Sequence, residues 1–257
     1  MSEEFVAGRN SVAEALRSGR SINKILVAKG DRQGSIREII GKARAQGIVV
    51  QETDPAKLDQ IAIGVRHQGI VALLAPVPYV DVSDILQKAA AHGETPFLVL
   101  LEELEDPHNV GAIMRTADAA GVHGLLLPKR RTSPITATVA KTSAGAVEYV
   151  PVARIGNVVQ TLNELKKQGF WIIGADMDGS QNYYSADLTG PVVVVVGSEG
   201  KGMGRLTKEA CDVLVRIPMK GQIGSLNASV ACSLLLYEVL RQRELKDHCP
   251  DGASVSP

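Results

Sequence analysis

Cysteine is scarce in this chain: its three copies, Cys211, Cys232 and Cys249, are far apart and form no C-x-x-C pair. This spacing suggests neither a zinc knuckle nor a disulfide framework, so we expect no metal site and a reduced, cytoplasmic setting. Long apolar runs are also missing. No window approaches 18 uninterrupted apolar residues, and the opening MSEEFVAGRN lacks the basic start and apolar core of a signal peptide. We therefore expect neither a membrane span nor a secretory leader.

Aromatic side chains and net charge are low as well. Aromatic residues make up only 4% of the 257 residues, so base stacking is not expected to dominate any recognition of nucleic acid. Lys plus Arg and Asp plus Glu both total 28, and this balance neither indicates nor excludes a polyanionic partner. The first 44 residues nevertheless carry more basic than acidic side chains. That excess is either a solvated face or a docking surface for a phosphate backbone.

What the chain does contain is an alternation of helical and apolar segments over a length that suits two domains. In the first part, apolar runs at 25–27, 48–50 and 67–74 alternate with helical patterns. The first of those helices ends near Arg17 and has Asn10 or Ser11 as its cap; the others cover 35–46 and a short stretch after Pro55. The Pro76-Val77-Pro78 punctuation ends this region. We predict a small α/β domain over 1–75 and a linker over 76–95 that includes a short helix at 83–91.

A more strongly apolar pattern follows. Its predicted strands are Phe97–Leu101, Gly124–Leu127, Phe170–Ala175, Val192–Val196 and Val213–Ile217. Strands that alternate with helices are typical of a parallel α/β sheet, and five consecutive valines suit a central strand covered on both faces. A last helix is predicted from Asn227 to about Arg243, with apolar residues at helical spacing. We therefore predict a second domain over 96–243 and a polar tail over 244–257.

Asn109 and Arg115 are the first candidate site residues. They lie in the segment DPHNVGAIMRTAD that follows the first strand of the larger domain. The carboxyl ends of parallel strands border the crevice in which α/β proteins bind ligands, so both side chains can face a ligand there. The alternative is local, with Asn109 as a helix cap and Arg115 as a surface cation.

The second candidate segment is GSEGKGMG, residues 197–204, which directly follows the valine strand. Four glycines in eight positions let the backbone approach a ligand closely. A phosphate loop of an ATPase would need glycine at position 195 and Ser or Thr at 202, but the chain has Val195 and Gly202. The G-x-G-x-x-G spacing of NAD-binding enzymes is absent too. A ligand held without a pyrophosphate cradle is favoured; the alternative is a glycine-rich turn that binds nothing.

The third segment is IPMKGQIGSLNASVA, residues 217–231. A strand ends at Pro218, a glycine-punctuated loop follows, and either Ser225 or Asn227 caps the last helix. Taken alone, each of the three segments is a modest signal of function.

Taken together, in this order and spacing, they resemble the three motifs of the SpoU, or TrmH-like, RNA 2′-O-methyltransferases. The matching patterns are N-x-G-x-x-x-R-T-A at 109–117, the apolar strand ending in G-S-E-G at 197–200, and I-P-M followed by S-L-N-x-S-V-A at 217–231. Residues 5–75 also resemble the ribosomal-protein-like RNA-binding domain of the subgroup that methylates a guanosine in 23S ribosomal RNA, most clearly at Gly8, 12–16 and 67–70. The resemblance covers nearly all of 5–243.

The resemblance implies a deep trefoil knot in the larger domain, which would be a rare exception to the rule that protein chains are not knotted. It implies S-adenosyl-L-methionine as the cofactor, and a homodimer whose active site draws on both subunits. It further implies that Gly197, Ile217 and Leu226 surround the adenosine, with Leu127 and Gly174 as weaker candidates.

The expected reaction is transfer of the sulfonium methyl group to a ribose 2′-hydroxyl of 23S ribosomal RNA. Similarity to the family points to Arg115 as the central catalytic residue. A guanidinium stays protonated and forms bidentate contacts with phosphate, so we favour a phosphate clamp over a base. Asn109 and Asn227 are expected to orient the ribose, Glu199 to hold the loop or Arg115, and Ser225 to contact substrate or cofactor.

Several alternatives stay open at this point. The substrate could be transfer RNA or another ribosomal RNA site, because the motifs indicate the reaction and not the nucleotide. A catalytically silent RNA-binding assembly factor would keep the same fold. His108 is more readily explained as a solvated loop residue than as a base. Lys129-Arg130-Arg131, just after a strand, is either an exposed patch or a contact with the RNA backbone.

Overall fold

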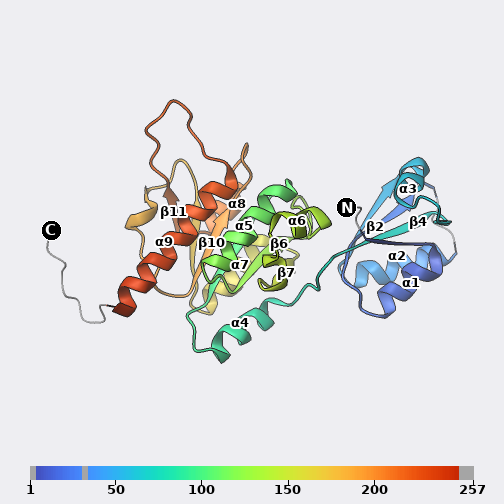
Figure 1. The fold of residues 1–257 in the computed structure, drawn as a ribbon, viewed down its shortest axis with the longest axis horizontal. Coiled ribbons are helices and arrows are strands. Elements are labelled where there is room, and N and C mark those ends of the chain that lie inside the picture. Colours follow the sequence, from blue (N-terminus) through green and yellow to red (C-terminus); the bar gives the residue numbers. More distant parts are fainter. Residues whose placement is uncertain (1–3, 31–33, 249–257) are drawn as a thin grey trace. The chain divides into compact units, whose positions relative to one another are not determined.

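The structure is a computed structural model that describes residues 4–30 and 34–248 (Figure 1). The described residues form two compact units, one built from the chain up to Tyr79 together with 134–141, and one built from the remainder. Of the residues considered above, Cys249 and most of the predicted tail, 249–257, lie outside the described part. The domain boundaries at 75 and 95 stay a prediction.

The first unit contains a four-stranded sheet in the order β1-β4-β2-β3. Its strands are β1 (Phe5–Ala7), β2 (Ile22–Ala28), β3 (Val49–Thr53) and β4 (Ile70–Leu74). Strand β2 runs parallel to β3 and antiparallel to β4. Because side chains alternate along β2 and β4, one set packs against α1 (Arg9–Arg17) and α2 (Ser35–Ala45) and the other against α3 (Pro55–Ile61). Helices therefore cover both faces of this sheet.

Helix α1 starts at Arg9, before either of the predicted caps. Gly8, at φ 92°, precedes the helix, and its carbonyl accepts the backbone N–H of Val12 at 3.0 Å. The prediction that Asn10 or Ser11 caps α1 is wrong, because a glycine in the left-handed half of φ space makes the entry turn instead.

The second unit contains a seven-stranded sheet in the order β7-β6-β5-β10-β8-β11-β9, with every neighbouring pair parallel. Its strands are β5 (Phe97–Leu101), β6 (Gly124–Pro128), β7 (Val152–Ile155), β8 (Trp171–Ala175), β9 (Gln181–Asn182), β10 (Val192–Val196) and β11 (Val213–Arg216). The prediction of a parallel α/β sheet is confirmed, and all five predicted strands are present to within one residue at each end. Strands β7 and β9 were not predicted. The trefoil knot stays a prediction.

The helices around this sheet are α4 (Val82–Ala91), α5 (Pro107–Ala119), α7 (Val158–Lys167), α8 (Arg205–Ala210) and α9 (Ala228–His248). A further helix, α6 (Ala137–Thr142), lies mostly in the segment that packs with the first unit. Helix α9 continues to His248, past its predicted end at Arg243. None of the helices in the described part of the chain is long and apolar enough to cross a bilayer.

The valine strand β10 lies between β5 and β8, although these three strands are far apart in sequence. All five valines are buried. Since the strands are parallel, the loops that follow β5, β8, β10 and β11 all leave from the same edge of the sheet. This arrangement brings the starts of the segments after β5, β10 and β11, which contain the three motifs, to one edge of the sheet.

Candidate functional site

Glu199 joins the three motif segments through one carboxylate oxygen. Its Oε1 accepts from Asn109 Nδ2 at 2.9 Å, from Asn227 Nδ2 at 2.5 Å and from the backbone N–H of Ala228 at 3.3 Å. Asn227 Nδ2 also donates to Asn109 Oδ1 at 3.0 Å. These side chains come from α5, from the loop after β10 and from the start of α9. Within the described residues, no hydrogen bond is recorded for Glu199 Oε2, so this oxygen can accept one from a ligand.

Asn109 contributes its side chain to this cluster because another residue caps the helix. Asp106 accepts the backbone N–H of His108 at 2.8 Å, and Pro107 opens α5. A proline suits the first helical position because its missing N–H would have no partner there. The alternative in which Asn109 is only a cap is therefore wrong: its side chain is free to reach Glu199, and the residue is 7% exposed.

Asn227 is the cap of α9, which decides between the two residues predicted for that role. Its Oδ1 accepts the backbone N–H groups of Ser229 at 3.0 Å and Val230 at 3.3 Å. With its oxygen on the helix end and its nitrogen on Glu199 and Asn109, both ends of the amide are engaged. Asn227 therefore fixes the position of the cluster relative to α9.

The loop after β10 needs its first glycine for packing. A Cβ on Gly197 would lie 2.2–2.4 Å from the backbone of Gly202 and Met203. Backbone bonds in both directions between Ser198 and Gly202, at 3.2 and 2.8 Å, close the turn. The loop thus has a defined conformation before any ligand is considered.

Glu102 anchors the other end of this loop and was not identified from the sequence. It follows β5, and its carboxylate accepts from the backbone N–H of Gly204 at 2.9 Å and from Thr207 Oγ1 at 2.6 Å. A carboxylate near the first turn of α8 also interacts favourably with the positive end of that helix. No local pattern could reveal this role, because the partners lie about a hundred residues away.

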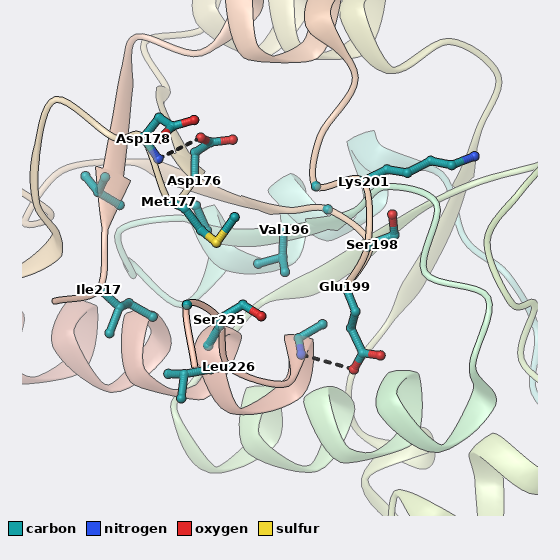
Figure 2. A pocket seen from close by; sticks show the side chains of 18 of the residues that line it. Asp176, Met177, Asp178, Val196, Ser198, Glu199, Lys201, Ile217, Ser225 and Leu226 are labelled. Carbon is teal, nitrogen blue, oxygen red and sulfur yellow. Dashed lines mark hydrogen bonds between the residues drawn. The ribbon is translucent and has the colours of Figure 1, made fainter. Parts of the chain in front are cut away.

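A cavity opens beside this loop, at the ends of β8, β10 and β11 (Figure 2). Among the residues proposed from the motifs, its lining includes Gly197, Glu199, Ile217, Ser225 and Leu226. Figure 2 shows Ile217 and Leu226 on one side, while Asp176 and Asp178 lie on another and Glu199 at a third. The cavity therefore combines an apolar wall with separate polar groups, as small-molecule sites commonly do.

Leu127 and Gly174, the two weaker candidates, are not part of the cavity lining. Leu127 is fully buried within β6. A Cβ on Gly174 would come within 2.7–2.8 Å of the side chains of Leu214, Cys211 and Met203. The structure thus explains this glycine by packing beneath the cavity rather than by contact with a ligand.

Asp176 and Lys208 line the cavity and were missed by the sequence analysis. Lys208 Nζ lies 2.6 Å from Asp176 Oδ2, and the Asp176 side chain is only 7% exposed. The second oxygen, Oδ1, accepts the backbone N–H of Asp178 at 3.0 Å. Asp176 directly follows β8, and that position was the one available signal, since ligand-binding residues in parallel sheets gather at strand ends.

Arg115 is exposed on α5 and does not line the cavity of its own chain. Its side chain has no recorded hydrogen bond or ion pair with the residues that the structure describes. The adjacent Thr116 bonds across to Ser233 of α9, with 3.0 Å between the hydroxyl oxygens. Helix α9 exposes apolar side chains near this contact: Val230 is 48%, Leu234 38% and Tyr237 50% exposed. Arg115 is thus an available cation beside an uncovered apolar surface.

The basic segment after β6 is partly neutralised. Arg131 Nη1 lies 2.8 Å from Glu103 Oε1, and the hydrogen bond and charge of Glu103 raise the pKa of Arg131. Arg130 and His108 are exposed. The exposed patch and the contact with the RNA backbone both stay predictions for this segment.

Thiol and metal chemistry find no support in the part of the chain that the structure describes. Burial raises the pKa values of Cys211 and Cys232 to about 12, so both thiols stay protonated and are poor nucleophiles. No group of three or more His, Cys, Asp or Glu side chains among the described residues is arranged to hold a metal ion.

Comparison with known families agrees with the motif resemblance. The model of the SpoU rRNA methylase family matches residues 96–237. A second model, described as RNA 2′-O ribose methyltransferase substrate binding, matches residues 5–80. The two matches together span most of the chain.

Individual proteins extend this similarity. The chain is 48% identical over 240 residues to the putative TrmH family tRNA/rRNA methyltransferase YacO of Bacillus subtilis, covering 93% of this chain and 96% of that protein. The AdoMet-bound rRNA methyltransferase from Sinorhizobium meliloti is 26% identical, with a TM-score of 0.58 over 92% of this chain and 86% of that one. The TrmH/SpoU tRNA modifying enzyme of A. aeolicus is 30% identical, with a TM-score of 0.56 over 66% and 89%.

Proposed function

The chain belongs to the SpoU family of RNA methylases, and on that basis we propose that it methylates the ribose 2′-hydroxyl of a guanosine in 23S ribosomal RNA. The observation that carries the reaction is the cluster in which Glu199 links Asn109 to Asn227 at the edge of the cavity, whereas the choice of substrate rests on the amino-terminal domain, residues 5–80. All three motif segments of the family meet in that cluster. The proposed substrate implies a cytoplasmic enzyme.

The cavity fits the proposed cofactor, S-adenosyl-L-methionine, in its chemistry. Ile217 and Leu226 provide apolar contacts suited to adenine, and Gly197 lines the cavity at the end of β10. When bound, the cofactor supplies an electrophilic methyl group on a sulfonium. The chain's own residues must then bring the 2′-hydroxyl into line with that methyl group and accept its proton.

We assign the direct contact that orients the ribose to Glu199. The unengaged Oε2 of Glu199 is the acceptor that the cluster offers to the 2′-hydroxyl or to Arg115. The amides of Asn109 and Asn227 are both engaged at both ends, so these two residues orient the ribose indirectly, by holding Glu199 in place. Ser225, in the cavity lining, is assigned a contact with substrate or cofactor.

Arg115 is assigned the role of a phosphate clamp. A guanidinium remains protonated in proteins and forms paired hydrogen bonds with phosphate oxygens. Because Arg115 is exposed and lies outside the cavity of its own chain, we propose that it serves the cavity of a second copy. The exposed apolar face of α9 is the surface that would join the two copies in a homodimer, since uncovered apolar surface favours association.

We further propose that residues 1–75 bind the RNA substrate and that 76–95 connect this part to the methyltransferase domain at 96–243, which carries the knot. The match of residues 5–80 to the substrate-binding family model supports this division.

A second candidate substrate is transfer RNA, because the relatives' names include both kinds of RNA. The deciding experiment is methyl transfer from labelled S-adenosylmethionine to protein-free 23S ribosomal RNA and, separately, to bulk transfer RNA, followed by nuclease mapping. Label in a 2′-O-methylguanosine of 23S RNA is the expected result. Label only in transfer RNA would overturn the substrate, and cofactor binding without any transfer would indicate a silent assembly factor.

A further inference from the structure

Asp176 is the buried carboxylate in the cavity whose contacts leave it able to serve a ligand. Its side chain is only 7% exposed, in contrast to the exposed neighbour Asp178. The other carboxylate considered above, Glu199, is occupied with the motif segments through Oε1 and lies on a different side of the cavity (Figure 2). Asp176 needs an explanation of its own.

The contacts of Asp176 define what it can offer. Lys208 lies 2.6 Å from Oδ2, and the backbone N–H of Asp178 donates to Oδ1 at 3.0 Å. A carboxylate has about four acceptor positions, so these two contacts leave acceptor capacity on both oxygens. Because Lys208 already balances the charge, the pair presents hydrogen-bond acceptors rather than a net negative charge. Such a group suits neutral hydroxyl donors better than a cation.

The position of Asp176 selects among the donors of the cofactor. It follows β8 directly, beside β10, and faces the cavity from a side away from Ile217 and Leu226 (Figure 2). If adenine occupies that apolar wall, the ribose is the next polar part along the molecule, and the cofactor analogues below distinguish it from the exocyclic amine. Carboxylates at the end of a parallel strand commonly accept hydrogen bonds from a ribose diol.

We infer that Asp176, held in place by Lys208, recognises the ribose 2′,3′-diol of the cofactor. This inference rests on the proposed function, since it requires the cofactor to occupy this cavity. It assigns the recognition of the cofactor's ribose hydroxyls, a role that is given to none of the motif residues.

The test is calorimetric binding of S-adenosylhomocysteine and of its 2′-deoxy and 3′-deoxy forms to the full-length protein. A hydroxyl bonded to a charged acceptor is worth roughly 10- to 100-fold in affinity. We expect the wild-type protein to lose about that factor with at least one deoxy form. In Asp176→Ala, affinity for S-adenosylhomocysteine should fall to the same level, and the difference between the normal and deoxy forms should vanish.

Two further ligands separate the ribose from the rest of the cofactor. S-inosylhomocysteine lacks the exocyclic amine, and 5′-methylthioadenosine lacks the amino-acid tail. Removing the amine or the tail should lower the affinity of Asp176→Ala by the same factor as it lowers the affinity of the wild-type protein. The inference is overturned if Asp176→Ala still binds the deoxy forms more weakly than S-adenosylhomocysteine. It is also overturned if Asp176→Ala instead becomes insensitive to loss of the amine or the tail.

Asp178→Ala is the matched control, because it removes the same group two residues away from an exposed position. Asp178→Ala should still bind the deoxy forms more weakly than S-adenosylhomocysteine. If that difference in affinity disappears in Asp178→Ala and not in Asp176→Ala, Asp176 is the wrong residue. Leu226→Arg tests the placement of the cofactor separately. If Leu226→Arg binds S-adenosylhomocysteine as well as the wild type does, the cavity is not the cofactor site and the inference falls with it. If Leu226→Arg loses binding but Asp176→Ala has no effect, only the inference is refuted. Thermal unfolding of each variant confirms that it is folded.

Discussion

Arg115 and the cavity can be inactivated separately, and this allows a test of whether the active site is shared between two copies. Arg115→Ala removes an exposed cation on α5 that has no recorded polar contact with the described residues. Leu226→Arg places a cation in the lining of the cavity, where it fills apolar space and repels a sulfonium. Neither residue belongs to the buried core, so both variants are expected to fold.

The expected magnitudes follow from the geometry. A guanidinium clamp on phosphate is worth about 3 kcal/mol, so Arg115→Ala should lower kcat/KM roughly 100-fold while cofactor affinity stays unchanged. Leu226→Arg should abolish cofactor binding. A mixed dimer has one Arg115→Ala subunit and one Leu226→Arg subunit. If Arg115 serves the cavity of its partner, the cavity of the Arg115→Ala subunit is complete, because it keeps its own Leu226 and receives the guanidinium of the other subunit. Random exchange at equal concentrations makes about half of the dimers mixed, so about a quarter of wild-type activity should return.

The assay is methyl transfer to RNA by each variant alone and by the mixture after exchange. A mixed dimer purified with two different affinity tags should have about half of the wild-type activity, because one of its two sites is complete. If Arg115 acts within its own chain, neither site is complete. A purified mixed dimer no more active than its parents would refute the shared site, and a monomer in solution would refute the dimer.

Three further outcomes are expected. Asn227→Ala removes the cap of α9 and should lower the free energy of unfolding by about 1–2 kcal/mol in urea titrations while also impairing methyl transfer; unchanged stability would contradict the cap assignment. Gly174→Ala should lower the free energy of unfolding by about 1–3 kcal/mol through overpacking, and loss of cofactor affinity without loss of thermal stability would instead favour a ligand contact. In a Cys249→Ser background, the partly buried Cys211 and the buried Cys232, with pKa values of about 12, should resist a thiol reagent at pH 8 until the protein unfolds, and rapid labelling of the native protein would contradict these raised pKa values.

The apolar pattern located the central strands well because burial on both faces leaves a continuous signal. Val192–Val196 and Phe97–Leu101 needed no tertiary information, since few structures other than a covered strand suit such runs. The edge strand β9 has only two residues, Gln181 and Asn182, and it carries no apolar signal. Helix starts were less predictable. At α5 the cap is Asp106 rather than Asn109, because a proline one residue after the cap fixes the first turn.

The composition of the site could be read from the three motifs, but its contacts could not. Glu199 bonds to Asn109 across 90 residues, and Glu102 to Gly204 across 102. Those pairings depend on β10 lying beside β5, and nothing local in the sequence specifies that order. Asp176 was missed for the same reason: only the neighbouring strands make the residue after β8 part of the cavity.

The contacts of Asn109 and Asn227 also bear on how the roles within the site divide. A polar group that is fully engaged within the protein can position others but has little capacity left for a ligand, whereas a group with an unengaged donor or acceptor can bind one. Asn109 and Asn227 are of the first kind, and Glu199 Oε2, Asp176 and Arg115 are of the second. These three groups suit different ligands: an acceptor for the reacting hydroxyl, an acceptor for a neutral diol and a cation for phosphate. Two of them face the cavity of their own chain and Arg115 does not, and this difference is the reason for the proposal that Arg115 serves the cavity of a second copy.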